Sequence, residues 1–279
     1  MAGVLAPGGP LVKPPLAPGA GQGRVAGMAM LTTPQGRRLA HELRPGAGVP
    51  VAFLGGLRSD MTGTKAVALR DWAQARGRPF LRFDYSGHGA SDGRFEDGCI
   101  GDWLQDAVAA LDLLAAPAVL VGSSMGGWLA LLIARAMPDR VAVLVTVAAA
   151  PDFTRWSMSD ALTPVERADL RAHGRIARPS DYGPPMVITR RLIDEGCTHQ
   201  VLDRPLALPM PVRMLQGTAD VDVPPVIALR LLDHAIGPDI RLTLVKGADH
   251  RFSTPDCLAL LGQTLDALVD GAADPSADA

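Results

Sequence analysis

Ser124 is the residue whose surroundings most clearly indicate chemistry. It lies in the pattern Gly-Ser-Ser-Met-Gly at 122–126, after a short apolar run and before a long apolar segment. A strand, a sharp turn and a helix in this order form a nucleophile elbow, which presents a serine hydroxyl at a strained backbone position. Strand and helix approach closely there, so the residues two before and two after the serine must be very small. Gly122 and Gly126 meet this requirement around Ser124, whereas Ser123 would have Val and Met at its flanks. We therefore predict Ser124 as a nucleophile rather than part of an ordinary glycine-rich turn.

A serine hydroxyl needs a general base to accept its proton. In folds that carry this elbow, the chain order is serine, acid, histidine. His250 lies in the loop that follows the last apolar run, at 240–245, and open α/β sheets place their sites at the carboxyl ends of strands. His234 falls within an expected helix. We therefore predict His250 as the base, with His234 as the second candidate.

The acid is expected after the preceding strand, in a loop that contains both Asp220 and Asp222. We favour Asp220, which stands three residues after Gly217. Asp222 is the second candidate, and Asp152, after the strand that ends at 147, is a remote third. The alternative for Asp220 is a solvated turn carboxylate or a helix cap.

Two backbone N–H groups should stabilise the oxyanion that forms when a serine attacks a carbonyl. One is expected from Met125, the residue after the nucleophile. The other is expected from Leu57, because Gly55-Gly56 allows the chain to turn sharply after the first buried strand. The alternative is that Gly55-Gly56 is a plain tight turn.

The elements that must position these residues alternate between short apolar strands and helices. This alternation predicts an α/β fold, with a mostly parallel sheet covered by helices on both faces. We expect strands in 28–43 (two, around a turn at 34–36) and at 51–54, 80–83, 118–121, 141–147, 212–215 and 240–245, and helices at 64–75, 102–114, 125–136, 224–236 and 255–269.

The alternation breaks between 151 and about 209, which we interpret as a cap inserted over the active site. Thr163-Pro164-Val165-Glu166 has the pattern of a helix start with a capping box, and a second helix is expected over Met186–Glu195. The alternative is a scaffold layer without substrate contact. Trp156 in this segment is a candidate for lining an acyl pocket, or else an aromatic side chain that ties the cap to the core.

Composition limits the classes of function. The formal net charge is −2, with no basic stripe, so we expect no nucleic-acid partner. Three widely spaced cysteines offer neither a disulfide framework nor metal-binding spacing, and we expect a cytoplasmic protein. No apolar run reaches the ~18–20 residues of a membrane span. Residues 1–24 are rich in Gly and Pro and are expected to be a disordered tail, 25–270 one α/β domain, and 271–279 a polar tail.

With these residues placed, the sequence over about 25–270 resembles the α/β-hydrolase superfamily. Four stretches are similar to a family of mitochondrial palmitoyl-protein thioesterases that also cleave acyl glucuronides, and to its bacterial relatives: 61–66 (MTGTKA), 82–87 (RFDYSG), 89–93 (GASDG) and 121–128 (VGSSMGGW). The resemblance implies an eight-stranded sheet with an inserted cap and hydrolysis of acyl thioesters and activated acyl esters. It implies a small-molecule or lipidated acyl substrate, no metal or organic cofactor, and Ser124, Asp220 and His250 as the catalytic triad. Gly55-Gly56 departs from the His-Gly or Pro-Gly that is commoner in the superfamily.

Other functions on this fold remain as alternatives. A general carboxylesterase or a peptidase would use the same triad. A binding protein descended from a hydrolase is a further alternative, but such proteins usually lose a triad residue, and all three positions are filled here. Enzymes of this fold with an aspartate nucleophile do not match a serine at the elbow.

Overall fold

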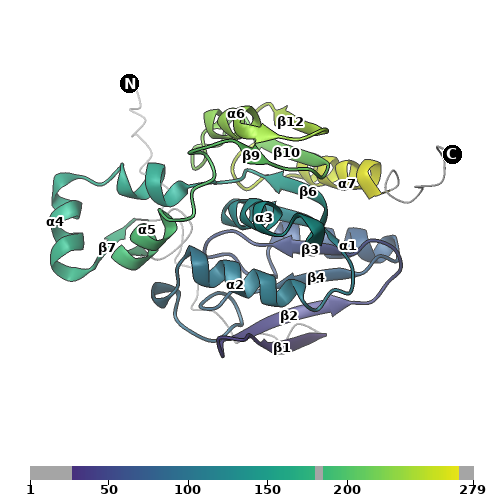
Figure 1. Cartoon of the computed structure of the whole chain (residues 1–279), viewed down its shortest axis with the longest axis horizontal. Helices are drawn as coiled ribbons and strands as arrows, with labels where there is room; N and C mark the ends of the chain where they lie inside the picture. The colour runs from purple at the N-terminus through teal and green to yellow at the C-terminus, as the bar shows by residue number, and fades with distance from the viewer. Residues whose placement is uncertain (1–26, 180–184, 270–279) are drawn as a thin grey trace, which may run out of the picture.

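One sheet of eight strands runs through the part of the chain that this computed structural model describes, residues 27–179 and 185–269 (Figure 1). The strand order is β1-β2-β4-β3-β5-β6-β10-β12. Strands β1, β2 and β4 pair antiparallel, and the remaining neighbours pair parallel. The predicted α/β sheet is therefore confirmed, whereas the expected tails at 1–24 and 271–279 lie outside the described residues. The strands are β1 (Met28–Thr32), β2 (Arg38–Arg44), β3 (Val51–Leu54), β4 (Phe80–Phe83), β5 (Ala118–Ser123), β6 (Val141–Val147), β10 (Val212–Gly217) and β12 (Ile240–Val245).

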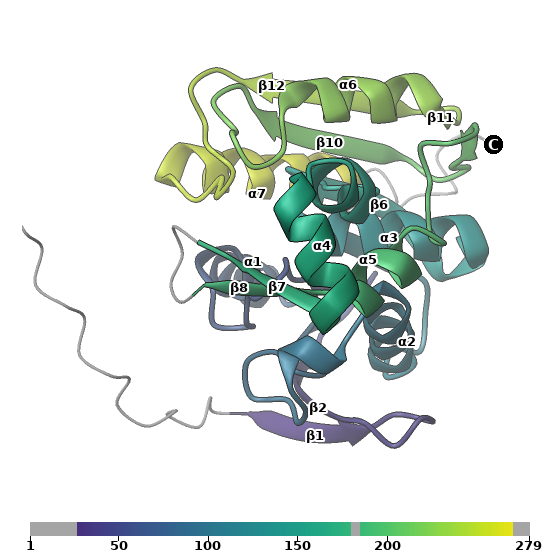
Figure 2. The same cartoon turned by 90° about the vertical axis from the view of Figure 1, so that its left-hand side faces the viewer.

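Helices cover both faces of this sheet (Figure 2). On one face, α1 (Thr64–Ala75) and α7 (Pro255–Val269) share an apolar cluster with the strands. On the other face, α2 (Ile100–Leu111), α3 (Met125–Ala136) and α6 (Pro225–His234) contribute to a second cluster. Strands β3, β4 and β5 are buried along their whole length, which explains why they are continuous apolar runs rather than alternating ones.

The segment between β6 and β10 extends from one side of the sheet (Figure 1). It contains a π-helix at Thr154–Ser159, α4 (Pro164–His173), a hairpin of β7 (Arg175–Arg178) and β8 (Met186–Thr189), α5 (Arg190–Gly196) and the short strand β9 (Leu206–Ala207). Its apolar side chains, among them Leu170, Ile188 and Leu192, belong to the same cluster as α2 and α3. The segment therefore packs onto the sheet domain through a shared core. Its role as a cover of the active site remains a prediction.

Helix α4 begins as its sequence predicts. The backbone N–H of Glu166 donates to Thr163 Oγ1 at 3.2 Å, and the backbone N–H of Thr163 donates to the Glu166 carboxylate at 2.8 Å. This reciprocal capping box satisfies two donors that a helix start otherwise leaves without a partner.

The prediction of a helix over Met186–Glu195 is wrong for the first half of this segment. Residues Met186–Thr189 form β8, which pairs antiparallel with β7, and the helix begins only at Arg190. Thr189 caps that helix by accepting from the backbone N–H of Leu192 at 3.1 Å. Val187 and Ile188 are β-branched and favour the strand. Helix α6 also ends earlier than expected, because Ala235–Ile236 pairs with β9 as the short strand β11.

Among the described residues, no helix combines the length and the apolar character that a membrane crossing requires.

Candidate active site

The turn between β5 and α3 holds Ser124 in a strained conformation. Its φ of 54° and ψ of −117° lie outside the regions that a residue with a Cβ normally occupies. The glycines on either side are required by contact distances: a Cβ on Gly122 would lie 2.4 Å from the Gly126 carbonyl oxygen, and one on Gly126 would lie 2.1 Å from the Leu54 carbonyl oxygen. The spacing argument from the sequence thus corresponds to a close approach of β5, α3 and β3.

Of the three residues predicted as a triad, His250 lies within hydrogen-bond distance of the other two. His250 Nε2 is 3.1 Å from Ser124 Oγ, and His250 Nδ1 is 2.9 Å from Asp220 Oδ2. Asp220 follows β10, and His250 follows β12, so both come from the carboxyl ends of parallel strands. The side chain of His250 is 19% exposed and that of Asp220 is fully buried, an arrangement in which solvent reaches the imidazole but not the carboxylate.

The Asp220 carboxylate is held by donors from its own loop. Its Oδ1 accepts from the backbone N–H groups of Asp222 at 3.0 Å and Val223 at 2.8 Å, and its Oδ2 also accepts from Gln216 Nε2 at 2.9 Å. Burial raises the pKa of Asp220, but hydrogen bonds from His250, Val223 and Gln216 outweigh burial, and the pKa lies below its usual value. The group is therefore an anion at neutral pH.

Gln216 was not predicted from the sequence. Its amide also donates to the carbonyls of Gly217 and Val223, so it ties the end of β10 to the loop that carries the acid. The sequence feature that could have indicated it is a polar residue directly after the mostly apolar run at 212–215.

The loops that carry the acid and the histidine contact each other directly. The backbone N–H of Ala219 donates to the Ala248 carbonyl at 3.0 Å, and that of Gly247 donates to Thr218 Oγ1 at 2.9 Å. A Cβ on Gly217 would lie 2.2 Å from the Ala248 carbonyl oxygen. These contacts fix the relative positions of Asp220 and His250.

The two predicted oxyanion donors come from the elbow itself and from the loop after β3. Met125 is the first residue of α3, so its N–H is one of the donors that a helix leaves without an intrahelical partner. The loop after β3 passes close to the nucleophile, because a Cβ on Gly56 would lie 3.3 Å from Ser124 Cβ. Leu57 is the next residue in that loop, and its assignment as a donor remains a prediction.

Two buried charged residues near β4 hold the same loop from its far end. The Arg82 guanidinium donates to the Met61 carbonyl at 2.6 Å, and Asp84 Oδ1 accepts from the Met61 backbone N–H at 2.6 Å. Arg82 also forms a buried ion pair with Glu42. Neither Arg82 nor Asp84 was predicted to have a role at the site. The signal that could have indicated one is a charge within the apolar run at 80–83 and a second charge directly after it.

The alternative candidates have other contacts. Asp222 is exposed, whereas the Asp152 carboxylate accepts from the backbone N–H groups of Val201 and Leu202 at 2.8 and 2.9 Å. His234 Nδ1 lies 2.9 Å from the Arg230 carbonyl oxygen of its own helix. The Trp156 indole donates to the Pro151 carbonyl at 2.7 Å and its ring packs against the core. That contact supports the tying role weighed for Trp156, and its contact with a substrate remains a prediction.

Ligand atoms of Asp220, Asp222 and His250 lie within 4.8 Å of one another, a spacing that a metal ion could use. Both ring nitrogens of His250 face partners, Asp220 on one side and Ser124 on the other. A metal bound to the imidazole would displace one of these contacts, so the donor set fits proton transfer better than metal ligation.

A mostly parallel sheet with a strained serine between strand and helix defines the class of α/β hydrolases. Comparison with known proteins agrees: the profile of the alpha/beta hydrolase family matches residues 45–260. The chain belongs to this family, and its relatives support a hydrolase that acts on ester or thioester bonds.

Within the family, the chain is similar to mitochondrial palmitoyl-protein thioesterases. It is 35% identical to palmitoyl-protein thioesterase ABHD10 of Rattus norvegicus over 247 residues, which cover 87% of this chain and 82% of the relative. The structure of alpha/beta hydrolase domain-containing protein 10 from mouse has a TM-score of 0.82 and 33% identity, covering 89% of this chain and 100% of that one. A putative hydrolase from Agrobacterium vitis has a TM-score of 0.84 and 40% identity, covering 87% and 98%.

These relatives correct one expectation. The cysteine pattern led us to expect a cytoplasmic protein, but the curated relatives are named as mitochondrial proteins. The cytoplasmic expectation is contradicted by this comparison. Reduced cysteines indicate a reducing compartment but do not distinguish one such compartment from another.

Proposed function

We propose that this chain is a serine hydrolase that cleaves acyl thioesters and activated acyl esters through an acyl-enzyme. The observation that carries the proposal is the position of the His250 imidazole, whose two nitrogens face Asp220 and Ser124 at 2.9 and 3.1 Å. A buried anion on one nitrogen and a hydroxyl on the other is the arrangement that turns serine into a nucleophile.

In the first half-reaction, Ser124 Oγ attacks the acyl carbonyl carbon while its proton passes to His250 Nε2. Asp220 holds the opposite N–H of the ring and stabilises the imidazolium. The N–H groups of Met125 and Leu57 are directed at the oxyanion of the tetrahedral intermediate. The bond from carbon to sulfur or oxygen then breaks, and His250 returns the proton to the departing thiol or alcohol.

In the second half-reaction, water replaces the leaving group. His250 takes a proton from the water as it attacks the acyl-enzyme carbonyl, and the same two N–H groups hold the second oxyanion. Collapse of this intermediate breaks the ester bond to Ser124 Oγ, which recovers its proton from His250. The products are the free acid and the original enzyme.

The choice of a thioester substrate is supported by the relatives, which are named as palmitoyl-protein thioesterases. Their identity of 34–35% extends over 87% of this chain. We therefore propose S-acylated thiols as the principal substrate class, with activated oxygen esters as substrates of the same site.

The test compares an acyl-thioester series with oxygen esters that have the same acyl chains. Ser124→Ala should lower kcat/KM for both series by about 10³-fold or more. The matched control is Ser123→Ala, which removes the neighbouring hydroxyl and should keep most of the activity. Hydrolysis that survives Ser124→Ala would contradict the mechanism, and equal rates for thioesters and oxygen esters would indicate a general carboxylesterase.

A further inference from the structure

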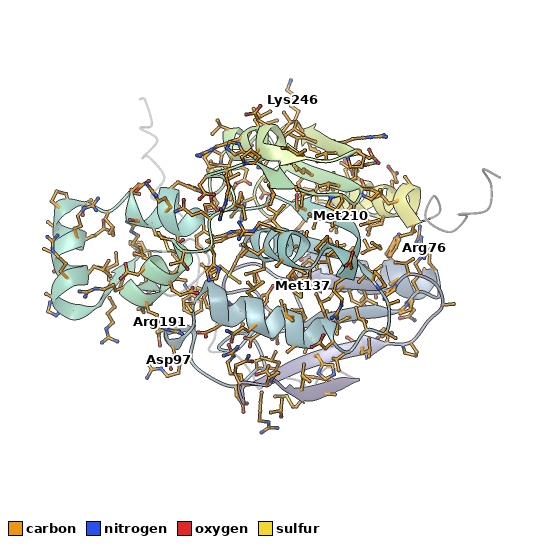
Figure 3. The ribbon with its side chains drawn as sticks, viewed as in Figure 1. Arg76, Asp97, Met137, Arg191, Met210 and Lys246 are labelled. Atoms are coloured by element: carbon orange, nitrogen blue, oxygen red, sulfur yellow. The ribbon has the colours of Figure 1, made fainter. Side chains whose placement is uncertain are left out.

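Lys65 is a charged residue beside the candidate site that the mechanism above does not use. It lies in the first turn of α1, and its ammonium group donates to the backbone carbonyl of Arg251, the residue directly after His250. Lys65 is partly buried, whereas Lys246, at the start of the loop that carries His250, is exposed and points away from the molecule (Figure 3).

The carboxylates and the guanidinium around Lys65 belong to the loops of the candidate triad, and a thiol from α7 lies near them. Burial lowers the pKa of Lys65 to about 8; the carboxylates of Asp249 and Asp220 and the Cys257 thiol oppose this effect, whereas the Arg251 guanidinium adds to it. The ammonium form predominates at neutral pH, but it loses its proton at a lower pH than an ordinary lysine does.

The histidine loop is fixed by the protein on either side of the Lys65 contact. Before His250, Ala248 accepts from the backbone of Ala219 in the acid loop. After it, Phe252 is fully buried with a positive φ of 48°, and its N–H donates to Asp249 Oδ1 at 3.1 Å. The Arg251 carbonyl lies between these two fixed points, and Lys65 holds it from another element.

Lys65 also follows the loop that carries the predicted oxyanion donor. That loop is held at Met61 by Arg82 and Asp84, and α1 begins three residues later at Thr64. The Lys65 contact therefore joins the segment with Leu57 to the segment with His250, the two sides of the site between which a reacting carbonyl would lie.

We propose that Lys65 is a positioning residue for His250: its ammonium group holds the Arg251 carbonyl and so fixes the imidazole against Ser124. This inference rests on the proposed function, because it assigns Lys65 to the same site. Small displacements of a catalytic base reduce the rate of the chemical step without a matching loss of substrate binding. The charged ammonium is the stronger donor, so kcat should fall as the pH rises through about 8.

The experiment uses Lys65→Met and Lys65→Arg in the full-length chain. Methionine keeps an apolar stem but removes the donor, and should lower kcat by about 10-fold or more with KM changed less than about twofold. Arginine stays charged at all accessible pH values. It should restore most of the activity and remove the alkaline decline near pH 8.

Two quantities are measured from pH 6 to 10. One is kcat on an activated acyl ester, corrected for spontaneous hydrolysis, and the other is the rate at which a fluorophosphonate labels Ser124. Lys246→Met is the matched control and should behave as wild type. Circular dichroism and unfolding curves identify a variant that has lost its fold, and Lys65→Arg then still tests the pH effect.

The failures of the two proposals are distinguishable. If the wild type reacts at Ser124 but Lys65→Met retains full kcat, or Lys65→Arg keeps the alkaline decline near pH 8, the inference about Lys65 is wrong and the proposed function stands. If the wild type is not labelled at Ser124, the proposed function fails and the role of Lys65 fails with it.

Discussion

The pH dependence of unfolding should change when the buried carboxyl of Asp84 is replaced by the isosteric amide in Asp84→Asn. Asp84 is 2% exposed, and its two oxygens accept from the backbone N–H groups of Met61 at 2.6 Å and Ala90 at 2.8 Å. Burial raises its pKa from the usual 3.8 to about 6, although these hydrogen bonds and Arg82 oppose the shift and Asp60 adds to it. The folded protein therefore binds a proton at Asp84 more readily than the unfolded chain does.

This difference in proton binding determines the sign and the size of the pH dependence of the free energy of unfolding. Between about pH 4 and pH 6 the folded state holds a proton that the unfolded chain has lost, so the contribution of Asp84 to stability falls as the pH rises through this window. A pKa that moves from 3.8 to about 6 corresponds to about 3 kcal/mol, at about 1.4 kcal/mol for each pKa unit. Asparagine does not titrate, so the variant loses this dependence.

Urea unfolding of both proteins from pH 4 to pH 7.5 measures the effect. The free energy of unfolding of Asp84→Asn minus that of wild type should increase by about 2 kcal/mol across this range, because part of the full difference develops below pH 4. Groups that titrate equally in both proteins cancel in this difference. Asp92→Asn, at a side chain that is 59% exposed, is the matched control and should give a difference that changes little with pH. A difference for Asp84→Asn that is flat from pH 4 to pH 7.5 would show that folding does not raise the pKa of Asp84.

Two further substitutions test the packing and the acid. Gly126→Ala places a Cβ 2.1 Å from the Leu54 carbonyl oxygen and should lower the free energy of unfolding by about 3 kcal/mol or more. Gly55→Ala is the control: its Cβ would have its nearest neighbour at 3.9 Å, so it should lower the free energy of unfolding by less than about 1 kcal/mol. Equal losses in the two variants would contradict the close approach of α3 to β3. Asp220→Asn should lower kcat by about 10³-fold or more whereas Asp222→Asn should keep most of the activity, and the reverse result in steady-state kinetics would move the acid to Asp222.

The elements next to the candidate site could be predicted because local chemistry determines them. The continuous apolar runs at 51–54 and 118–121 correspond to β3 and β5, which are buried on both faces. The small residues around Ser124 correspond to contacts in which no Cβ fits. Asp220 and His250 were chosen by their order in the chain, and the structure places His250 within hydrogen-bond distance of both Asp220 and Ser124. Their catalytic roles stay predictions.

The elements that were misplaced depend on contacts between distant residues. Strand β8 exists because Ile188 pairs with Ile176 on β7, and α6 ends at His234 because the next two residues pair with β9. Neither pairing leaves a signal in a local window of sequence. Lys65 was missed for the same reason, because its partner lies in a loop 186 residues away. Gln216 was missed for a different reason: its partners are close in sequence, but they lie in a turn whose conformation the sequence does not specify.

The most direct measurement is the reaction of the full-length protein with a fluorophosphonate, followed by intact mass and by mapping of the labelled peptide. We expect one adduct, on Ser124, that forms in wild type and in Ser123→Ala and is lost in Ser124→Ala. Labelling should also slow strongly in His250→Ala, because the base 3.1 Å from Ser124 Oγ is removed. Equal labelling of wild type and Ser124→Ala would contradict the assignment of Ser124 as the nucleophile.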